Sequence, residues 1–201
     1  MNDVGKQEHK EKKAAVILAA GSGRRMNTPV AKQFLDLMGI PVFLHSVRLF
    51  DKVADKIVLV TSPDAVEYCQ NLLEKEELCA EVIVIAGKSE RFLSSMEGVR
   101  TASDCDLIMI HDAARACVDM EVIERSIASA RIHGSGVAAV PLKDTVKVAD
   151  QNGMVLSTPD RSTLRIIQTP QTFKHDIICA AYDHLNLSLI HISEPTRHAQ
   201  I

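Results

Sequence analysis

The chain has 201 residues, a length typical of one domain, and 46% of them are hydrophobic, which is enough for a complete core. The net charge of −3 argues against a nucleic-acid partner, because phosphate contacts need an excess of lysine and arginine. We find no apolar run of the roughly 18–20 residues that a membrane-spanning helix needs, so no membrane partner is expected. The five cysteines are scattered and odd in number, which is typical of reduced thiols in a cytosol rather than of disulfides or a zinc site.

The first 13 residues are mostly polar and mixed in charge, and we expect them to form a disordered leader. After them, short β-rich runs alternate with helical patterns. Strands are expected at Ala14–Leu18, Lys56–Thr61, Glu81–Ala86, Asp106–His111 and Gly136–Val140. Helices are expected at Val42–Phe50, Ala65–Glu76, Glu90–Ser103 and Asp119–His133. This alternation predicts an α/β fold with a mostly parallel sheet and helices on both faces.

Residues 141–171 interrupt the alternation. Two short runs, Lys143–Val148 and Met154–Ser157, flank the segment Gln151-Asn152-Gly153, and Asn-Gly is a typical hairpin turn. The residues alone leave two interpretations open. The hairpin is either an arm that packs on another subunit or an excursion on the surface.

The first expected strand leads into the segment Ala19-Ala20-Gly21-Ser22-Gly23-Arg24-Arg25-Met26, and Lys32 follows soon after. Small residues let backbone N–H groups approach a phosphate or a base, and the cations supply positive charge where a triphosphate would lie. The spacing differs from that of the ATPase phosphate loop and of the dinucleotide-binding turn. It predicts a binding site for a nucleoside triphosphate, although similar turns occur in α/β proteins that bind nothing there.

Two further polar clusters, Gly87–Arg91 and His111–Arg115, also follow expected strands. The carboxyl ends of parallel strands meet at one edge of a sheet, where ligands bind, so we expect one common site. Glu90 and Arg91 either form a solvated pair or support this site. We expect His111 to pack under the site rather than to act as a general base, because a phosphate monoester is already ionised near neutral pH.

These segments, together with Lys32-Gln33-Phe34, Asp144-Thr145, Asp160-Arg161 and Thr169-Pro170-Gln171, occur in the order and spacing of one family. Over roughly residues 13–186 the chain resembles the 2-C-methyl-D-erythritol 4-phosphate cytidylyltransferases, which make the cytidine diphosphate intermediate of the non-mevalonate isoprenoid pathway. The resemblance implies a Rossmann-like fold with a protruding β-hairpin arm at about 141–165 that joins a homodimer. It also implies a cytoplasmic nucleotidyltransferase of isoprene biosynthesis that uses CTP, a sugar-alcohol phosphate and Mg²⁺.

The resemblance assigns roles to individual residues. Those that would contact the nucleotide are Ala19, Ala20, Gly21, Gly87, Ser94 and Thr169. Those that would act in catalysis are Arg25, Lys32, Asp112, Arg115, Thr145 and Arg161. Within this second set, Arg25 and Lys32 would hold the triphosphate and Asp112 would hold Mg²⁺. Arg115 would lie near the sugar phosphate, and the two arm residues would reach the substrate of the neighbouring subunit.

In the implied reaction, a phosphate oxygen of the sugar phosphate attacks the α-phosphorus of CTP and pyrophosphate leaves. Such a reaction needs aligned and neutralised phosphates but no covalent enzyme intermediate. Two alternatives stay open: a ribitol 5-phosphate cytidylyltransferase, which has the same motifs, and a non-catalytic nucleotide-binding domain. The segments Ala19-Ala20-Gly21 and Ala113-Ala114 favour the erythritol enzyme. Catalysis is favoured by the intact set of Arg25, Lys32, Asp112 and Arg161.

The C-terminal segment departs from the family. Residues 187–201 resemble the translated product of a transposase-type sequencing adapter, although the alternation around Leu189-Ile190-His191-Ile192 is also compatible with a natural strand. We therefore expect a domain of residues 14–186 that lacks the family's C-terminus, followed by a non-native tail. Such truncation can leave the chain inactive. The domain also departs from the family at two positions. Ala116 stands where the family usually has a proline, and Leu93 stands where the family usually has a polar residue.

Overall fold

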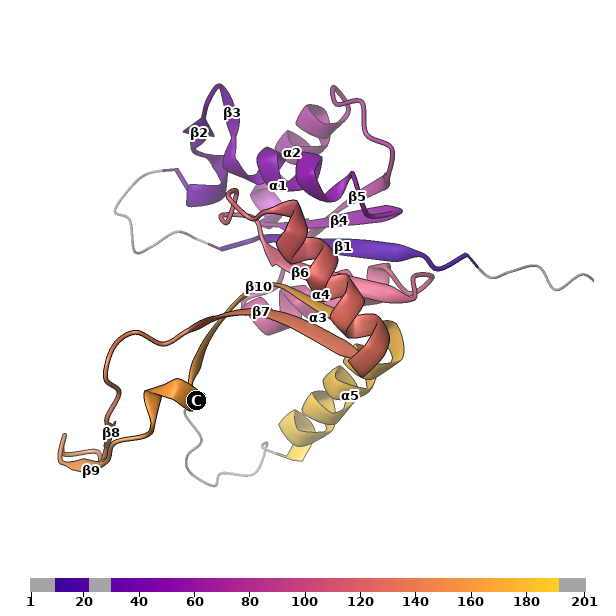
Figure 1. Ribbon diagram of the computed structural model, residues 1–201. Helices are drawn as coiled ribbons and strands as arrows, with labels where there is room; N and C mark the ends of the chain where they lie inside the picture. Colours follow the sequence, from indigo (N-terminus) through magenta and orange to yellow (C-terminus); the bar gives the residue numbers. More distant parts are fainter. Residues whose placement is uncertain (1–9, 22–29, 192–201) are drawn as a thin grey trace, which may run out of the picture.

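The structure of the chain is a computed structural model that describes residues 10–21 and 30–191, and only the backbone of residues 186–191. Its main feature is a six-stranded sheet in the order β5-β4-β1-β6-β10-β7 (Figure 1). The strands of this sheet are β1 Lys13–Ala19, β4 Lys56–Thr61, β5 Glu81–Ala86, β6 Leu107–Asp112, β7 Ser135–Pro141 and β10 Arg165–Lys174. The α-helices are α1 Val42–Phe50, α2 Val66–Leu73, α3 Arg91–Thr101, α4 Met120–His133 and α5 His175–His191.

The sheet is mostly parallel, as the alternation predicts. β1 pairs in parallel with β4 and with β6, and β4 pairs in parallel with β5. β10 is antiparallel to both of its neighbours, β6 and β7. The chain therefore adds β4 and β5 on one side of β1 and then crosses over to place β6 on the other side. In open α/β sheets, ligands bind outside the carboxyl ends of the strands at such a reversal.

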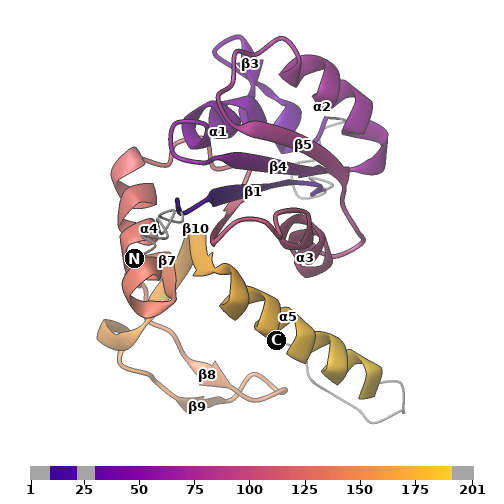
Figure 2. The ribbon, with the colours of Figure 1, turned by 90° about the vertical axis from the view of Figure 1, so that its right-hand side faces the viewer.

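Helices cover both faces of this sheet (Figure 2). Alternate residues of β1 show the division between the faces. Ala15 and Ile17 belong to a core cluster with residues of α1, α2 and α4, whereas Ala14 and Val16 belong to a cluster with residues of α3 and α5. All four side chains are fully buried, which explains why this central strand has a continuous apolar sequence. Among the helices of the described residues, none has both the length and the apolar character that a membrane crossing needs.

The sequence predicts the positions of most elements. β4, β5 and α1 have the predicted bounds, and the other predicted strands and helices differ by one to a few residues at their ends. The expected disordered leader needs a correction at its end, because Lys13 is the first residue of β1. Just before it, Glu11 forms an ion pair with Arg131 of α4 at 2.6 Å. Residues 1–9 lie outside the described part of the chain.

α5 corrects the sequence prediction, which contains no helix after residue 174. Ile178 and Tyr182 of this helix pack with the core cluster that includes α3, and the Tyr182 hydroxyl donates a hydrogen bond to Ser95 Oγ at 2.7 Å. Their spacing of four residues is the signal that identifies such a helix. The backbone of α5 continues to His191, where the sequence allowed a strand. Residues 192–201 are outside the described ranges, and the origin of the tail stays a prediction.

Residues 142–164 form an arm that extends away from the sheet (Figure 1). At its end, β8 (Val148–Ala149) pairs antiparallel with β9 (Val155–Ser157). The Asp150 carboxylate accepts hydrogen bonds from the backbone N–H groups of Asn152 and Met154, each at 2.9 Å. Gly153 has φ of 83°, a conformation that glycine adopts without strain. The hairpin and its Asn-Gly turn are thus as predicted, with shorter paired strands.

Gly98 lets α3 pack closely on β1 and β4. A Cβ atom at this position would collide with the Val16 side chain and lie 3.1 Å from Cγ2 of Val60. Valine side chains are stiff and these two are fully buried, so neither can move aside easily.

We therefore expect Gly98→Ala to lower the free energy of unfolding by about 1–3 kcal/mol, although alanine favours a helix intrinsically. Denaturant titration measures this change. The double variant Gly98→Ala/Val16→Ala should lose less stability than the sum of its single variants, because the smaller side chain removes the collision. Additive losses would show that the collision is not the cause.

Candidate active site

A cleft of about 820 Å³ opens at the carboxyl ends of β1, β5 and β6. It lies where the strand order reverses, at the edge that the sequence predicts. The residues that line it are Leu18, Ala20, Gly21, Lys32, Gln33, Lys88, Ser89, Glu90, Arg91, Ser94, Asp112, Ala114 and Arg115. Four of these side chains are cations and two are carboxylates, so the cleft favours an anionic ligand.

The turn after β1 forms one wall of the cleft. Ala20 and Gly21 line it directly, and Lys32 joins them from a short 3-10 turn at Lys32–Phe34. The side chain of Gln33 donates hydrogen bonds to the carbonyl oxygens of Ala19 and Gly21. No sequence pattern indicates this role of Gln33, because its partners are more than ten residues away. Arg25, which was expected to hold a triphosphate, lies outside the described residues.

The loop after β5 packs against this wall. A Cβ atom at Gly87 would lie 2.7 Å from Cβ of Ala20 and 2.9 Å from Oγ of Ser94, so only glycine fits without a shift. The Ser94 hydroxyl accepts a hydrogen bond from the Lys88 N–H at 2.9 Å and donates one to the Lys88 carbonyl at 3.3 Å. Ser94 therefore holds the backbone of this loop in place, and Gly87 lets the two loops approach each other.

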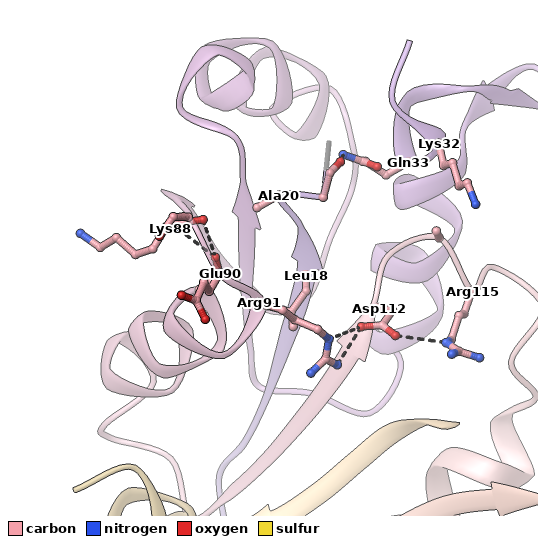
Figure 3. A pocket seen from close by; sticks show the side chains of 13 residues that line it. Leu18, Ala20, Lys32, Gln33, Lys88, Glu90, Arg91, Asp112 and Arg115 are labelled. Atoms are coloured by element: carbon pink, nitrogen blue, oxygen red, sulfur yellow. Dashed lines mark hydrogen bonds and ion pairs between the residues drawn. The ribbon is translucent and has the colours of Figure 1, made fainter. Parts of the chain in front are cut away.

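Asp112, at the end of β6, lies between two arginines (Figure 3). Its Oδ1 accepts hydrogen bonds from Nη2 and Nε of Arg91 at 2.8 and 3.1 Å, and its Oδ2 accepts one from Nε of Arg115 at 3.2 Å. Burial raises the pKa of Asp112, but the hydrogen bonds and charges of Arg91 and Arg115 outweigh it, so the pKa lies below the usual value. Arg91 is thus a partner of Asp112 and not of Glu90, which decides the alternative that the sequence left open.

The carboxylate of Asp112 is also the candidate ligand of a metal ion. Within residues 10–21 and 30–191, no cluster of three or more histidine, cysteine or acidic side chains is suited to hold a metal. Mg²⁺ commonly takes one or two carboxylates and completes its shell with water and substrate phosphates. A carboxylate has about four acceptor positions, and the arginines occupy three of them. Asp112 therefore fits a magnesium ion that is held mainly by phosphates.

His111 is fully buried beneath this loop, with its ring 4.8 Å from the Phe50 ring. Nε2 lies 3.3 Å from the Arg115 carbonyl, and Nδ1 lies 3.1 Å from Thr169 Oγ1. A carbonyl only accepts, so Nε2 carries the proton, and Nδ1 of the neutral ring accepts from the Thr169 hydroxyl. Burial lowers the pKa of His111 to about 4. The ring thus stays neutral, and it packs under the site as the sequence predicts.

The remaining predicted residues lie elsewhere. Thr169 does not line the cleft: it borders a second cavity of about 780 Å³ between α4 and β7, and its hydroxyl also accepts from the Asp112 N–H at 3.3 Å. Thr145 and Arg161 belong to the arm and are not among the cleft residues. Arg161 donates to the Lys143 carbonyl at 3.2 Å. The single chain therefore brings together Ala20, Gly21, Lys32, Ser94, Asp112 and Arg115.

Burial of neutral His111 predicts a pH-dependent stability. Its pKa of about 4 lies below the ordinary value of 6.5, so between these values the unfolded chain binds the extra proton and stability falls as the pH falls. We expect the wild type to lose about 2 kcal/mol more than His111→Gln between pH 7 and pH 5. Urea titrations measure this difference. A chelator is present so that metal binding does not contribute to the stability. Equal losses in both proteins would contradict it.

Comparisons with known proteins show similarity to one family. A profile of the family 2-C-methyl-D-erythritol 4-phosphate cytidylyltransferase (IspD) matches residues 13–195. A protein of that name from Caldanaerobacter subterraneus subsp. tengcongensis is 40% identical over 173 residues, which cover 84% of this chain and 76% of the relative. One from Lachnospira eligens is 39% identical over 85% of this chain and 76% of the relative.

Solved structures show the same fold. The crystal structure of 4-diphosphocytidyl-2C-methyl-D-erythritol synthase from Anaerococcus prevotii superposes with a TM-score of 0.77 and 26% identity, over 94% of this chain and 80% of that chain. The matched sequence range contains every residue that forms the cleft. The chain therefore belongs to the 2-C-methyl-D-erythritol 4-phosphate cytidylyltransferase family.

Proposed function

We propose that the cleft described above transfers the cytidylyl group of CTP to the phosphate of 2-C-methyl-D-erythritol 4-phosphate, releasing pyrophosphate. As a member of its family, the chain is a nucleotidyltransferase of isoprenoid biosynthesis. One observation carries the assignment to this cleft: Asp112 and its two arginines face the wall formed by Ala20 and Gly21, across a cavity that is large enough for a nucleotide. This arrangement places positive charge beside a nucleotide-sized space.

The proposed mechanism uses charge and alignment. Lys32, on the wall of the cleft, binds the triphosphate and offsets the charge that moves onto the leaving pyrophosphate. Arg115 binds the incoming sugar phosphate and reduces its repulsion by CTP. Asp112 holds both arginines in place and offers its remaining acceptor position to Mg²⁺. When bound, Mg²⁺ neutralises phosphate charge and makes the α-phosphorus easier to attack.

The arm supports a proposal of a homodimer. Met154, Val155 and Leu156 are each more than half exposed at its end. A contiguous apolar surface of this kind is commonly covered by a partner. In the proposed dimer, the partner's copy covers this surface, and the arm brings Thr145 and Arg161 to the neighbouring cleft. Their absence from the cleft of their own chain is consistent with this arrangement.

We also propose that the enzyme works in the cytoplasm. Cys69, Cys79, Cys105, Cys117 and Cys179 are all free thiols in the structure. Free thiols persist in a reducing compartment, whereas secreted domains commonly pair them.

The substrate assignment is tested by rates of pyrophosphate release with CTP and Mg²⁺. We expect turnover with 2-C-methyl-D-erythritol 4-phosphate to exceed turnover with ribitol 5-phosphate by at least about tenfold, since misplacement of the reacting phosphate is costly. A preference for ribitol 5-phosphate would assign the chain to the alternative enzyme. Binding of CTP without release of pyrophosphate, with either acceptor, by a version that carries a complete family C-terminus would identify a non-catalytic nucleotide-binding domain.

The shared site predicts complementation between inactive variants. Lys32→Ala and Arg161→Ala should each lower kcat/KM by about 10²-fold or more, because each removes a charged contact to a phosphate. After equal amounts are mixed and allowed to exchange subunits, activity should recover to about a quarter of the wild-type value, since hybrid dimers contain one site with both residues intact. Lys75 is exposed and does not line the cleft. The variant Lys75→Ala is therefore the matched control and should keep full activity.

This experiment needs a measurement of subunit exchange, for which native mass spectrometry of differently labelled subunits is suited. If hybrids form and activity does not return, the two residues act in one subunit and the shared-site proposal is wrong.

A further inference from the structure

Gln33 is a polar side chain that is buried next to the cleft, with only 5% of its surface exposed. Its Nε2 lies 2.5 Å from the Ala19 carbonyl oxygen and 2.9 Å from the Gly21 carbonyl oxygen. Both neighbours are acceptors, so the amide must present its NH₂ group to them, and both of its N–H bonds are used. The orientation of the Gln33 amide therefore follows from its two carbonyl partners, which can only accept hydrogen bonds.

The two hydrogen bonds determine how the turn after β1 faces the cleft. The carbonyl oxygens on both sides of Ala20 are directed at Gln33, which offsets their partial negative charge. Carbonyl oxygens that faced an anionic ligand would repel it. Because backbone groups are held in advance, a ligand that contacts Ala20 and Gly21 does not have to order them on binding.

The position of Gln33 is fixed by its neighbours in the sequence. Phe34 packs edge-on against the rings of Phe43 and Tyr68, with centroid distances of 5.9 and 5.7 Å. On the other side, Lys32 lines the cleft. Gln33 thus connects the backbone at Gly21 to the cation that would bind a triphosphate.

We propose that Gln33 is a positioning residue for nucleotide binding. Its amide holds the Ala19–Gly21 backbone at a fixed position relative to Lys32, so that the backbone and the lysine contact the nucleotide together. This inference rests on the proposed function of the cleft. In that proposed function the sugar phosphate binds from the Asp112 side, so Gln33 acts on the nucleotide and not on the acceptor.

Two variants test this role. Gln33→Met keeps the length of the side chain but removes both donors, and Gln33→Glu replaces the donors with a charge that faces two carbonyl oxygens. Isothermal titration of the full chain with CTP and Mg²⁺, without acceptor, should give a Kd about tenfold higher for Gln33→Met and higher still for Gln33→Glu. At saturating CTP, the KM for the sugar phosphate should stay within about twofold of the wild-type value.

The matched control is Ser126→Ala on α4. Ser126 is also buried and its hydroxyl lies 2.8 Å from Thr172 Oγ1, but it does not line the cleft. It should lose a similar amount of stability, seen in Tm, without a change in the Kd for CTP. A variant of Gln33 that binds CTP as the wild type does would overturn the proposal, as would equal losses for CTP and the sugar phosphate.

One further measurement uses the wild type and does not depend on folding of the variants. The Gln33 side-chain NH₂ protons should exchange slowly with solvent, and their NMR signals should shift when CTP is added. Fast exchange, or signals that CTP leaves unchanged, would contradict the role of Gln33. If the wild type fails to bind CTP in the titration, the proposed function itself is wrong.

Discussion

The carboxylate of Asp112 lies between the guanidinium groups of Arg91 and Arg115, and this contact joins three parts of the fold. Asp112 ends β6, Arg91 begins α3 and Arg115 belongs to the loop after β6. Two cations share one carboxylate, so the group keeps a positive charge toward the cleft. Charge that is already in place does not have to reorganise when phosphates arrive. Enzymes obtain much of their electrostatic stabilisation of the transition state from charges held in advance in this way.

Much of this arrangement can be predicted from the sequence, because it follows from local patterns. Continuous apolar runs such as Ile57–Val60 of β4 identify buried parallel strands, and polar clusters after such strands identify one edge of the sheet. Asp112 and Arg115 are close in sequence and follow the same strand, so their proximity is expected. The Asn152-Gly153 turn similarly predicts the hairpin at the end of the arm.

Other features depend on contacts between distant segments, which sequence patterns do not reveal. The pair of Arg91 with Asp112 spans 21 residues, and the contact of His111 with Thr169 spans 58. Gln33 contains no signal of its own, because an amide is equally common on surfaces. The helix α5 has only a weak sequence signal, because the core-facing pair Ile178 and Tyr182 stands among residues that are mostly exposed. In each case, tertiary packing determines the role of the side chain.

The central claim is that the site works by aligning and neutralising phosphates, without a side chain that becomes covalently attached to the nucleotide. Isotope exchange tests the claim directly: the enzyme is incubated with CTP, Mg²⁺ and labelled pyrophosphate, and label is sought in CTP. The account predicts no label in CTP until the sugar phosphate is added. Label that enters CTP without the sugar phosphate would reveal a cytidylyl-enzyme intermediate and contradict the account.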